Sequence, residues 1–403
     1  MKILMINSVC GIGSTGRICT DLASELENNG HSVKIAYGRG DVPERFQRFA
    51  THIGTDLDVF VHMVKARLFD LAGYGSKRAT EKFINWMREF EPDIIHIHNL
   101  HGYYLHIPTL FYELKISQQR IVWTLHDTWA FSGHSGTCDK VSCTKWKTGC
   151  GKCPLIRQYP FSIFDRSKFN WNWKREIFNS LDRTILVTPS IWLREQVKSS
   201  ILKNMKIRVI PNGIDTDQFV QKETNIKKKL GIQDKIVLLG VSSVWHKYKG
   251  LYDFYRLNEI IDRKKYVIVL VGLDEKQRKK IPEGILALPK TTSIKQLVDY
   301  YNMADIFINL TYCDVFGMVN LEALSCNTPV ITYDTGGTPE TVLEYGGIVV
   351  QKGCIEKVKK AIEEIHINKI QVKKIKELRE KYGKNSFTNN YINVYEDIIK
   401  NNI

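Results

Sequence analysis

The chain has 403 residues, 43% hydrophobic and 25% charged, which is enough for two domains of ordinary size and typical of a folded soluble protein. It has no run of roughly 20 unbroken apolar residues, the length that spans a bilayer, and its start, MKILMINSVC, lacks a signal peptide's longer apolar core and cleavage site. These features argue against a membrane-spanning or secreted protein and predict a cytoplasmic one. The formal net charge of +15 favours phosphate-bearing small molecules, nucleic acid or anionic lipid as partners, or reflects only a solvated basic surface.

Short runs rich in Val, Ile and Leu alternate with longer helical patterns along the whole chain. In order they are KILMI, SVKIAY, DIIHIH, RIVWTLHD, RTILVTPS, KIRVIPN, KIVLLGVSS, YVIVLVG, DIFINLT, PVITYD and GGIVV. Runs without strict alternation are typical of strands buried on both faces of a parallel sheet, and their alternation with helices indicates βαβ units. The series restarts after IPNGIDTDQF, which predicts a domain boundary there.

The pattern therefore predicts an α/β protein with two doubly wound, Rossmann-like domains and a cleft between them. We expect the first domain over residues 1–213, the second over residues 214–385, and a helix over residues 386–403 that crosses back to the first domain. Ligands of open parallel sheets bind at the carboxyl ends of the strands, so functional residues are expected just after the apolar runs.

The first of these places is a glycine loop. Gly11, Gly13 and Gly16 have the spacing G-x-G-x-x-G between a strand and a helical pattern, which is typical of a dinucleotide-binding turn. The second strand, however, ends without a carboxylate that would hold a ribose, although Arg39 would suit NADP. An NAD(P)-dependent oxidoreductase is therefore a weakened alternative, and glycines that serve only packing are another.

A sharper pattern follows the DIFINLT run in the second half. Asp314 and Glu322 lie eight residues apart, and a helix is predicted to begin at about Met318, directly after Gly317. The start of a helix exposes unpaired N–H groups and binds anions, and a glycine lets a phosphate approach the backbone closely. Glu322 would accept the hydroxyls of a ribose and Asp314 those of a sugar, so the spacing suits a nucleoside diphosphate sugar.

Two lysines precede this segment in the chain. Lys247 and Lys249 follow a predicted strand and come just before Gly250, where a helical pattern begins. A lysine in such a place is a point charge for a diphosphate, although both side chains could equally be solvated loop residues.

The segment from Asp314 to Val330, DVFGMVNLEALSCNTPV, resembles the E-x7-E motif of the retaining glycosyltransferases of family four, which have the GT-B fold. The resemblance extends over nearly the whole chain, through the glycine loop and the motifs PNGID, KG and GGTPE. There are three departures: the first acid is Asp314 rather than Glu, the next position is Val315 rather than Gly, and an expected arginine is Val244.

The resemblance implies a transferase that moves a sugar with retention from a nucleoside diphosphate sugar. The segments DIIHIHNLHGYYL and TLHDTWAFSGHSGTC look like the subgroup that builds bacterial exopolysaccharide of the colanic-acid type, which implies a glycan or undecaprenyl-linked sugar acceptor and no nucleic acid partner. The resemblance to the family also implies a front-face displacement that needs no metal ion. The catalytic residues implied are His126, Asp314 and Lys249, and the donor-binding residues are Gly13, Gly16, Arg17, Lys247, Gly317, Met318, Val319 and Glu322.

His126 would hydrogen-bond a hydroxyl of the donor sugar with a neutral ring, and Asp127 would orient it or cap the next segment. The alternative is a buried histidine bonded only to protein. The nearby spacing H-x-H-x-x-H, which begins at His96, could suggest a metal, but we favour packing or lining of the acceptor site.

An insert over residues 134–154 contains Cys138, Cys143, Cys150 and Cys153 in the spacing C-x4-C-x6-C-x2-C. Its last pair has the spacing of a zinc knuckle, so a structural zinc ion is expected, with free thiols, disulfides or an iron–sulfur cluster as alternatives.

Residues 59–90 mix apolar and aromatic side chains with six lysines and arginines. A basic amphipathic stretch can lie on an anionic membrane, which would make the protein peripheral on the inner face of the plasma membrane. The alternative is an ordinary helix with one face in the core. A basic nucleic-acid-binding protein is a further rival, but the sequence carries no motif for it.

Overall fold

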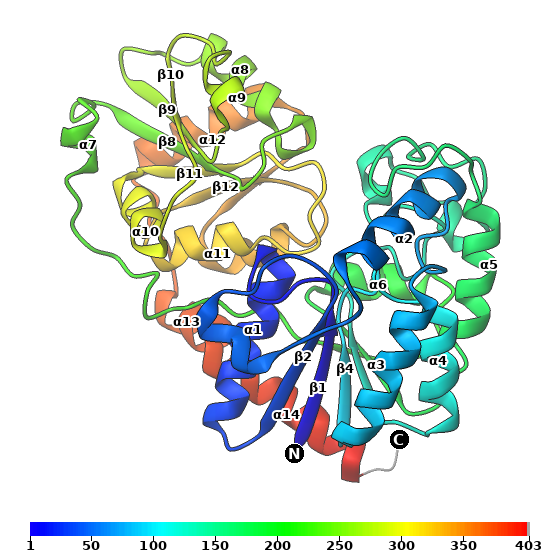
Figure 1. The fold of residues 1–403 in the computed structure, drawn as a ribbon. Helices are drawn as coiled ribbons and strands as arrows, with labels where there is room; N and C mark the ends of the chain where they lie inside the picture. Colours follow the sequence, from blue (N-terminus) through cyan, green and yellow to red (C-terminus); the bar gives the residue numbers. More distant parts are fainter. Residues whose placement is uncertain (401–403) are drawn as a thin grey trace. The chain divides into compact units, whose positions relative to one another are not determined.

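The protein is described by a computed structural model that covers residues 1–400. The chain divides into two compact units, and each is described by itself. The first comprises Met1–Pro211 and the chain from Phe387 onward, and the second comprises Asn212–Ser386 (Figure 1). Within residues 1–400, no helix combines the length and the apolar character needed to cross a membrane.

The first unit is built on a sheet of seven parallel strands: β1 (Lys2–Asn7), β2 (Ser32–Tyr37), β3 (Ala50–His52), β4 (Ile94–Ile97), β5 (Ile121–Thr124), β6 (Thr184–Thr188) and β7 (Lys206–Val209). Their order is β3-β2-β1-β4-β5-β6-β7. In register, Ile3 of β1 lies opposite Val33 of β2 and Ile94 of β4. The residues of β4, β5 and β6 are all buried, which explains their unbroken apolar runs.

The helices of this unit are α1 (Gly13–Asn28), α2 (Asp56–Phe69), α3 (Lys77–Phe90), α4 (Ile107–Ile116), α5 (Ser167–Phe178), α6 (Ile191–Lys198) and α14 (Lys384–Lys400), with short 3-10 turns η1 (Glu44–Phe49), η2 (Cys138–Val141) and η3 (Lys145–Lys147). Helices α1 and α14 lie on one face of the sheet, and α3 and α4 lie on the other (Figure 1). The C-terminal helix is fixed by polar contacts: Tyr391 Oη lies 2.9 Å from Thr124 Oγ1, and Tyr395 Oη lies 2.8 Å from His96 Nδ1.

The basic stretch at residues 59–90 forms two helices rather than one. Helix α2 ends at Phe69 and is followed by Asp70, which has a left-handed backbone (φ 53°), and α3 begins after Ser76. The connecting turn packs tightly, because a Cβ on Gly75 would lie 2.2 Å from the ring of His62. Helix α3 buries Phe83, Ile84 and Met87 and is an ordinary core helix, whereas α2 buries few residues.

The second unit has six parallel strands: β8 (Ile236–Val241), β9 (Tyr266–Val271), β10 (Ile285–Leu288), β11 (Ile306–Asn309), β12 (Val330–Tyr333) and β13 (Ile348–Val350), in the order β10-β9-β8-β11-β12-β13. Its helices are α7 (Ile226–Lys229), α8 (Leu251–Ile260), α9 (Glu275–Arg278), α10 (Ile294–Met303), α11 (Met318–Ser325), α12 (Ile355–Asn368) and α13 (Ile375–Tyr382), with turns η4 (Lys247–Lys249), η5 (Pro339–Thr341) and η6 (Leu343–Tyr345).

Alternate residues of this second sheet enter two different cores. Val237, Leu239 and Phe307 pack with residues of α10, α11 and α13, whereas Leu238 and Ile308 pack with residues of α8 and α12. Because side chains on a strand alternate between faces, a strand covered on both sides must be apolar at every position. This is the doubly wound arrangement that the sequence predicts.

Candidate functional site

The glycine loop connects β1 to α1, and the structural reason for glycine differs between its positions. Gly11 N donates to Gly16 O at 3.1 Å, and a Cβ on Gly16 would lie 3.2 Å from Gly11 N, so Gly16 allows the loop to fold onto the helix. Gly13 has a left-handed backbone (φ 64°), and a Cβ there would meet nothing within 4 Å. Arg17 is exposed, and its Nε donates to Gly13 O at 3.1 Å. Space for a ligand therefore exists at Gly13, while Gly16 is explained by packing.

His126 follows β5 and meets another histidine from the neighbouring strand end. Its Nε2 lies 3.0 Å from Nδ1 of His98, and the two rings are stacked with their centroids 5.3 Å apart. Burial lowers the pKa of His126 to about 4, against the opposing effect of Asp127, so its ring is neutral at pH 7. The neutral ring is the form that the sequence interpretation requires.

Asp127 caps the next segment, one of the two roles that the sequence suggests, and its other partner is His101. Its Oδ2 lies 2.8 Å from His101 Nε2, and its Oδ1 accepts from the Trp129 amide at 2.8 Å. Burial would raise the pKa of Asp127, but attraction to His101 and the hydrogen bonds lower it overall, so the carboxylate is charged. Asp127 thus caps the following turn and orients His101 rather than His126.

The histidine spacing that begins at His96 is explained by packing. His96 is fully buried, and its two ring nitrogens lie 2.8 Å from Thr124 Oγ1 and 2.8 Å from Tyr395 Oη. Burial lowers its pKa well below the usual value. Within residues 1–400, no three His, Cys, Asp or Glu side chains are already gathered as metal ligands.

In the second unit, the turn η4 and the loop after β11 pack against each other. The Tyr312 amide donates to Tyr248 O at 2.8 Å. Gly250 closes the turn with φ 77°, and a Cβ there would lie 2.3 Å from Leu310 O. Only glycine fits such a backbone approach, so the Lys-Gly pair of the sequence motif brings two strand ends together.

This packing pairs two of the predicted catalytic residues. Lys249 Nζ donates to Asp314 Oδ2 at 2.9 Å, and both side chains are partly exposed. Burial would lower the pKa of Lys249, but the attraction of Asp314 and the hydrogen bond raise it overall. The ammonium is therefore charged at physiological pH. Lys247 is exposed on the same turn, with Nζ 4.8 Å from the centroid of the Tyr248 ring.

The backbone of Asp314 also contacts the GGTPE motif. The Gly337 amide donates to Asp314 O at 3.2 Å, and a Cβ on Gly336 (φ 57°) would lie 1.8 Å from the same oxygen. The Asp314 Oδ1 accepts from the Phe316 amide at 3.3 Å. Asp314 is thus a fixed carboxylate immediately before α11.

Helix α11 begins where the sequence predicts. Gly317 is the residue before its first turn, and a Cβ there would lie 2.5 Å from Asn320 Nδ2 and 3.0 Å from Thr341 Oγ1. The Met318 amide donates to Phe316 O at 3.1 Å. A bound anion would have to compete with that bond, so the amides of Gly317 and Val319 are better placed to serve as donors than Met318.

Glu322 lies on the second turn of α11 and is partly exposed. Its Oε2 accepts from the hydroxyl of the buried Tyr301 at 2.7 Å. Burial and the Glu322 carboxylate raise the pKa of Tyr301 well above its usual value, so the phenol remains a donor. The carboxylate is therefore held in one orientation rather than rotating freely.

The sequence interpretation missed two supporting residues, Asn320 and Tyr301, and it considered His98 only as part of the histidine spacing. Asn320 bridges Asn309 Nδ2 at 2.9 Å and Thr341 Oγ1 at 3.0 Å, and it thereby joins α11 to β11 and η5. Tyr301 orients Glu322, and His98 meets His126. A polar residue in an otherwise apolar helix face is the only sequence signal that points to Asn320.

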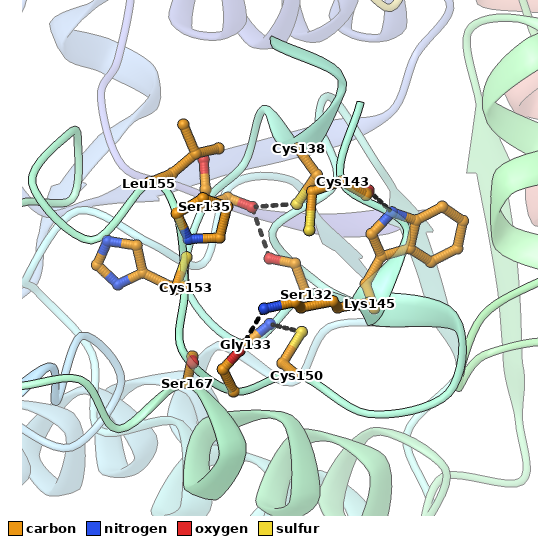
Figure 2. Close-up of a pocket in the computed structure, with 14 residues that line it drawn as sticks. Ser132, Gly133, Ser135, Cys138, Cys143, Lys145, Cys150, Cys153, Leu155 and Ser167 are labelled. Carbon is orange, nitrogen blue, oxygen red and sulfur yellow. Dashed lines mark hydrogen bonds between the residues drawn. The ribbon is translucent and has the colours of Figure 1, made fainter. Parts of the chain in front are cut away.

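The four cysteines of the insert come together around one small cavity, which they line with Gly133, His134 and Trp146 among others (Figure 2). All four are free thiols in the structure.

Comparison with known proteins identifies the family. The model described as "Glycosyltransferase Family 4" matches residues 15–218, about half of the chain, and the model described as "Glycosyl transferases group 1" matches residues 222–388. The chain is 24% identical over 371 residues to the "Putative colanic acid biosynthesis glycosyl transferase WcaC" of Escherichia coli (strain K12), which covers 87% of this chain and 88% of that protein.

Two further similarities are more limited. The chain is 26% identical over 215 residues to an N,N'-diacetylbacillosaminyl-diphospho-undecaprenol alpha-1,3-N-acetylgalactosaminyltransferase of Campylobacter jejuni, covering 50% of this chain and 57% of that protein. The crystal structure of HepE from Anabaena in complex with UDP and glucose has a TM-score of 0.68, with 13% identity, over 98% of this chain and 100% of that chain. At 13% identity, the similarity to HepE is a similarity of fold alone. The chain belongs to glycosyltransferase family 4, and its two units are the two Rossmann-like domains of a GT-B glycosyltransferase.

Proposed function

We propose that this glycosyltransferase moves a sugar, with retention, from a nucleoside diphosphate sugar to a glycan or undecaprenyl-linked acceptor in the synthesis of bacterial surface polysaccharide. The observation that carries the donor assignment is the Lys249–Asp314 pair directly before α11, with their 2.9 Å contact. It brings a charged ammonium, a fixed carboxylate and a helix start together at one place in the second unit. The similarities to the E. coli and C. jejuni proteins support the acceptor class.

Each residue at this place has a distinct role in the proposal. Lys249 and the amides at the start of α11 bind the diphosphate, because a cation and unpaired N–H groups both stabilise anions. Glu322, oriented by Tyr301, accepts the ribose hydroxyls. Asp314 accepts a hydroxyl of the transferred sugar, and Lys247 adds a second, more exposed charge.

The proposed reaction is a front-face displacement. The bond between the anomeric carbon and the diphosphate oxygen breaks, the acceptor oxygen bonds to the same face, and the acceptor proton passes to the departing phosphate. Stabilising the charge that develops on the leaving group is then the main task of the protein. We assign it to Lys249 and the α11 amides, with no requirement for a divalent metal ion, which activity in the presence of a chelator would test.

In the first unit, we assign His126 to a hydrogen bond with a substrate hydroxyl. Its neutral ring suits this role, and His98 at 3.0 Å fixes its orientation. The space at Gly13, beside Arg17, is proposed to take part in substrate binding through the backbone.

An apolar surface in the first unit supports membrane association. Helix α2 exposes Leu57 (70%) and Phe60 (56%), and the loop at residues 159–164 exposes Phe164 (58%). The two segments are continuous, since the Phe164 amide donates to Leu68 O at 3.2 Å and its ring stacks on Phe69 at 6.1 Å. Lys65 and Arg67 on the same helix add positive charge, so we propose that this surface contacts anionic lipid. Unchanged recovery with anionic and neutral vesicles at low salt would remove this assignment.

The donor assignment is tested by release of nucleoside diphosphate from a panel of UDP-, GDP- and ADP-sugars by the full chain. We expect one base to be strongly preferred, and the released sugar to retain its anomeric configuration. An inverted product, or binding of NADP in preference to every sugar nucleotide, would contradict the proposal.

A further inference from the structure

We propose that the insert around Cys138, Cys143, Cys150 and Cys153 is a structural zinc site. The four side chains come from three short segments: Cys138 from η2, Cys143 from the turn that follows it, and Cys150 and Cys153 from the loop after η3. Figure 2 shows their sulfur atoms around one common space. That cavity has a volume of about 20 Å³, which is room for a single water-sized ion.

The thiols surround this space more loosely than ligands surround a bound ion, since within residues 1–400 no three of them form a ready metal site. Instead, Cys138 Sγ donates to Ser135 O at 3.6 Å, and Cys150 Sγ accepts from the Gly133 amide at 3.2 Å. Ion binding would replace the S–H bonds with S–Zn bonds and release the protons. The Gly133 amide is then already in place as a hydrogen-bond donor to a thiolate, the outer contact that metal ligands usually have.

The backbone of the insert is shaped for close approach to this cavity. A Cβ on Gly133 would lie 2.1 Å from Ser167 O and 2.7 Å from Cys150 Cβ. The turn between Cys150 and Cys153 is held by Lys145, whose Nζ donates to the carbonyls of Gly151 and Lys152 at 3.1 Å each. These contacts favour a fixed arrangement of the last cysteine pair over a flexible loop.

A buried lysine contacts the lining of this cavity through Ser132. Lys174 of α5 is 1% exposed, and its Nζ donates to Trp129 O at 2.7 Å and to Ser132 O at 2.9 Å. Within the described part of the chain it forms no ion pair with an acidic side chain. The Lys174 Nζ also lies 3.3 Å from the centroid of the Trp129 ring, so two carbonyls and an aromatic face already stabilise the ammonium. The net charge of two minus on a zinc ion with four thiolates would add to that stabilisation.

The chemistry of the donors selects the ion. Four thiolates favour zinc or an iron–sulfur cluster, and a cavity for one ion favours zinc. Four protein ligands leave no open position for substrate, so the role is structural. The site would hold the insert against the end of α2, since Cys153 N donates to Asp165 Oδ2 at 2.5 Å and the Arg166 amide donates to Asp70 at 3.1 Å.

The test is the metal content of the full chain, purified under reducing conditions without added metal. We expect one zinc per chain by elemental mass spectrometry, and loss of that zinc in a Cys150→Ser/Cys153→Ser variant. The matched control is Cys354→Ser, which changes a partly exposed cysteine outside the insert and is expected to retain the zinc.

Because the double variant could fail to fold, a second measurement uses the wild-type chain. Cobalt added to the zinc-depleted protein is expected to give the absorption of a tetrahedral thiolate site, and chelation to increase hydrogen exchange at residues 133–166 but not in the second unit. Metal-free protein that takes up neither zinc nor cobalt, iron in place of zinc, disulfides within the insert, or zinc retained in the double variant would each overturn the proposal.

Discussion

Helices α1 and α11 each follow a loop that contains glycine, with α1 beginning at Gly13 and α11 directly after Gly317, and the two helix starts differ in what surrounds them. The loop before α1 has the full G-x-G-x-x-G spacing, but Gly16 serves packing, and Arg17 turns back to the loop carbonyl at 3.1 Å. The start of α11 has one glycine, yet Lys249, Asp314 and Glu322 surround it with fixed charges. The better-known glycine pattern is therefore the weaker guide to the donor site, and charged residues held by tertiary contacts are the stronger one.

The largest expected effect comes from removing the charge beside α11. Lys249→Met should lower kcat/KM by about 100- to 1,000-fold, the range seen when one donor to a developing anion is lost. Lys247→Met is the matched control, since Lys247 is exposed on the same turn and should cost less than about tenfold. Steady-state kinetics with the preferred donor measure both. Equal losses in the two variants would remove the special role of Lys249.

The glycines themselves provide the next comparison. Gly336→Ala should destabilise the protein by roughly 3 kcal/mol, because the Cβ of the new alanine would meet a backbone oxygen that cannot move away. Gly13→Ala meets no atom within 4 Å and should cost only the strain of a left-handed backbone, about 1–2 kcal/mol. Thermal or denaturant unfolding compares them. A larger loss in Gly13→Ala would reverse the comparison.

Acidification should act mainly on the first unit. Burial lowers the pKa of His126 to about 4 and those of His96 and His98 well below the usual value, so the unfolded chain binds more protons than the folded one below about pH 6.5. The free energy of unfolding should therefore fall as the pH drops from about 6.5 towards 4, by up to about 1.4 kcal/mol per pH unit for each histidine. Denaturant titrations at several pH values measure the slope. Stability that stays constant over this range would contradict the burial of these rings as neutral groups.

A smaller effect is expected at the ribose position. Glu322→Gln keeps the size of the side chain and removes its charge, and it should weaken binding of the nucleoside diphosphate by about tenfold, or about 1.4 kcal/mol. Tyr301→Phe should weaken binding by less, because it removes only the bond that orients Glu322. Calorimetry with the free nucleotide gives both values. Tighter binding in Glu322→Gln would indicate that the carboxylate faces the phosphates.

The sequence predicts the sheets and the start of α11 because both depend on local pattern. Apolar strands covered on two faces and a glycine before an apolar helix are visible without tertiary information. The pairing of Lys249 with Asp314 is a contact between residues far apart in the chain, so the two residues could be named from sequence but their 2.9 Å contact could not.

Other features have no local signal. The sequence suggests that Asp127 orients its neighbour His126 or caps the next segment, and the fold gives it the cap but pairs it with His101. The break between α2 and α3 depends on the left-handed Asp70 and on the close packing of Gly75 against His62, and neither is encoded in the charge pattern of residues 59–90. Neutral supporting residues such as Asn320 are recognised only from their contacts.

The central claim is that the donor diphosphate binds in the second unit, on Lys249 and the start of α11. Equilibrium binding of the preferred nucleoside diphosphate to the full chain tests it directly, with Lys249→Met and Arg17→Met compared in parallel. The account predicts a loss of at least about tenfold in Lys249→Met and a smaller change in Arg17→Met. Full affinity in Lys249→Met, together with loss of binding in Arg17→Met, would contradict it and move the diphosphate to the glycine loop of the first unit.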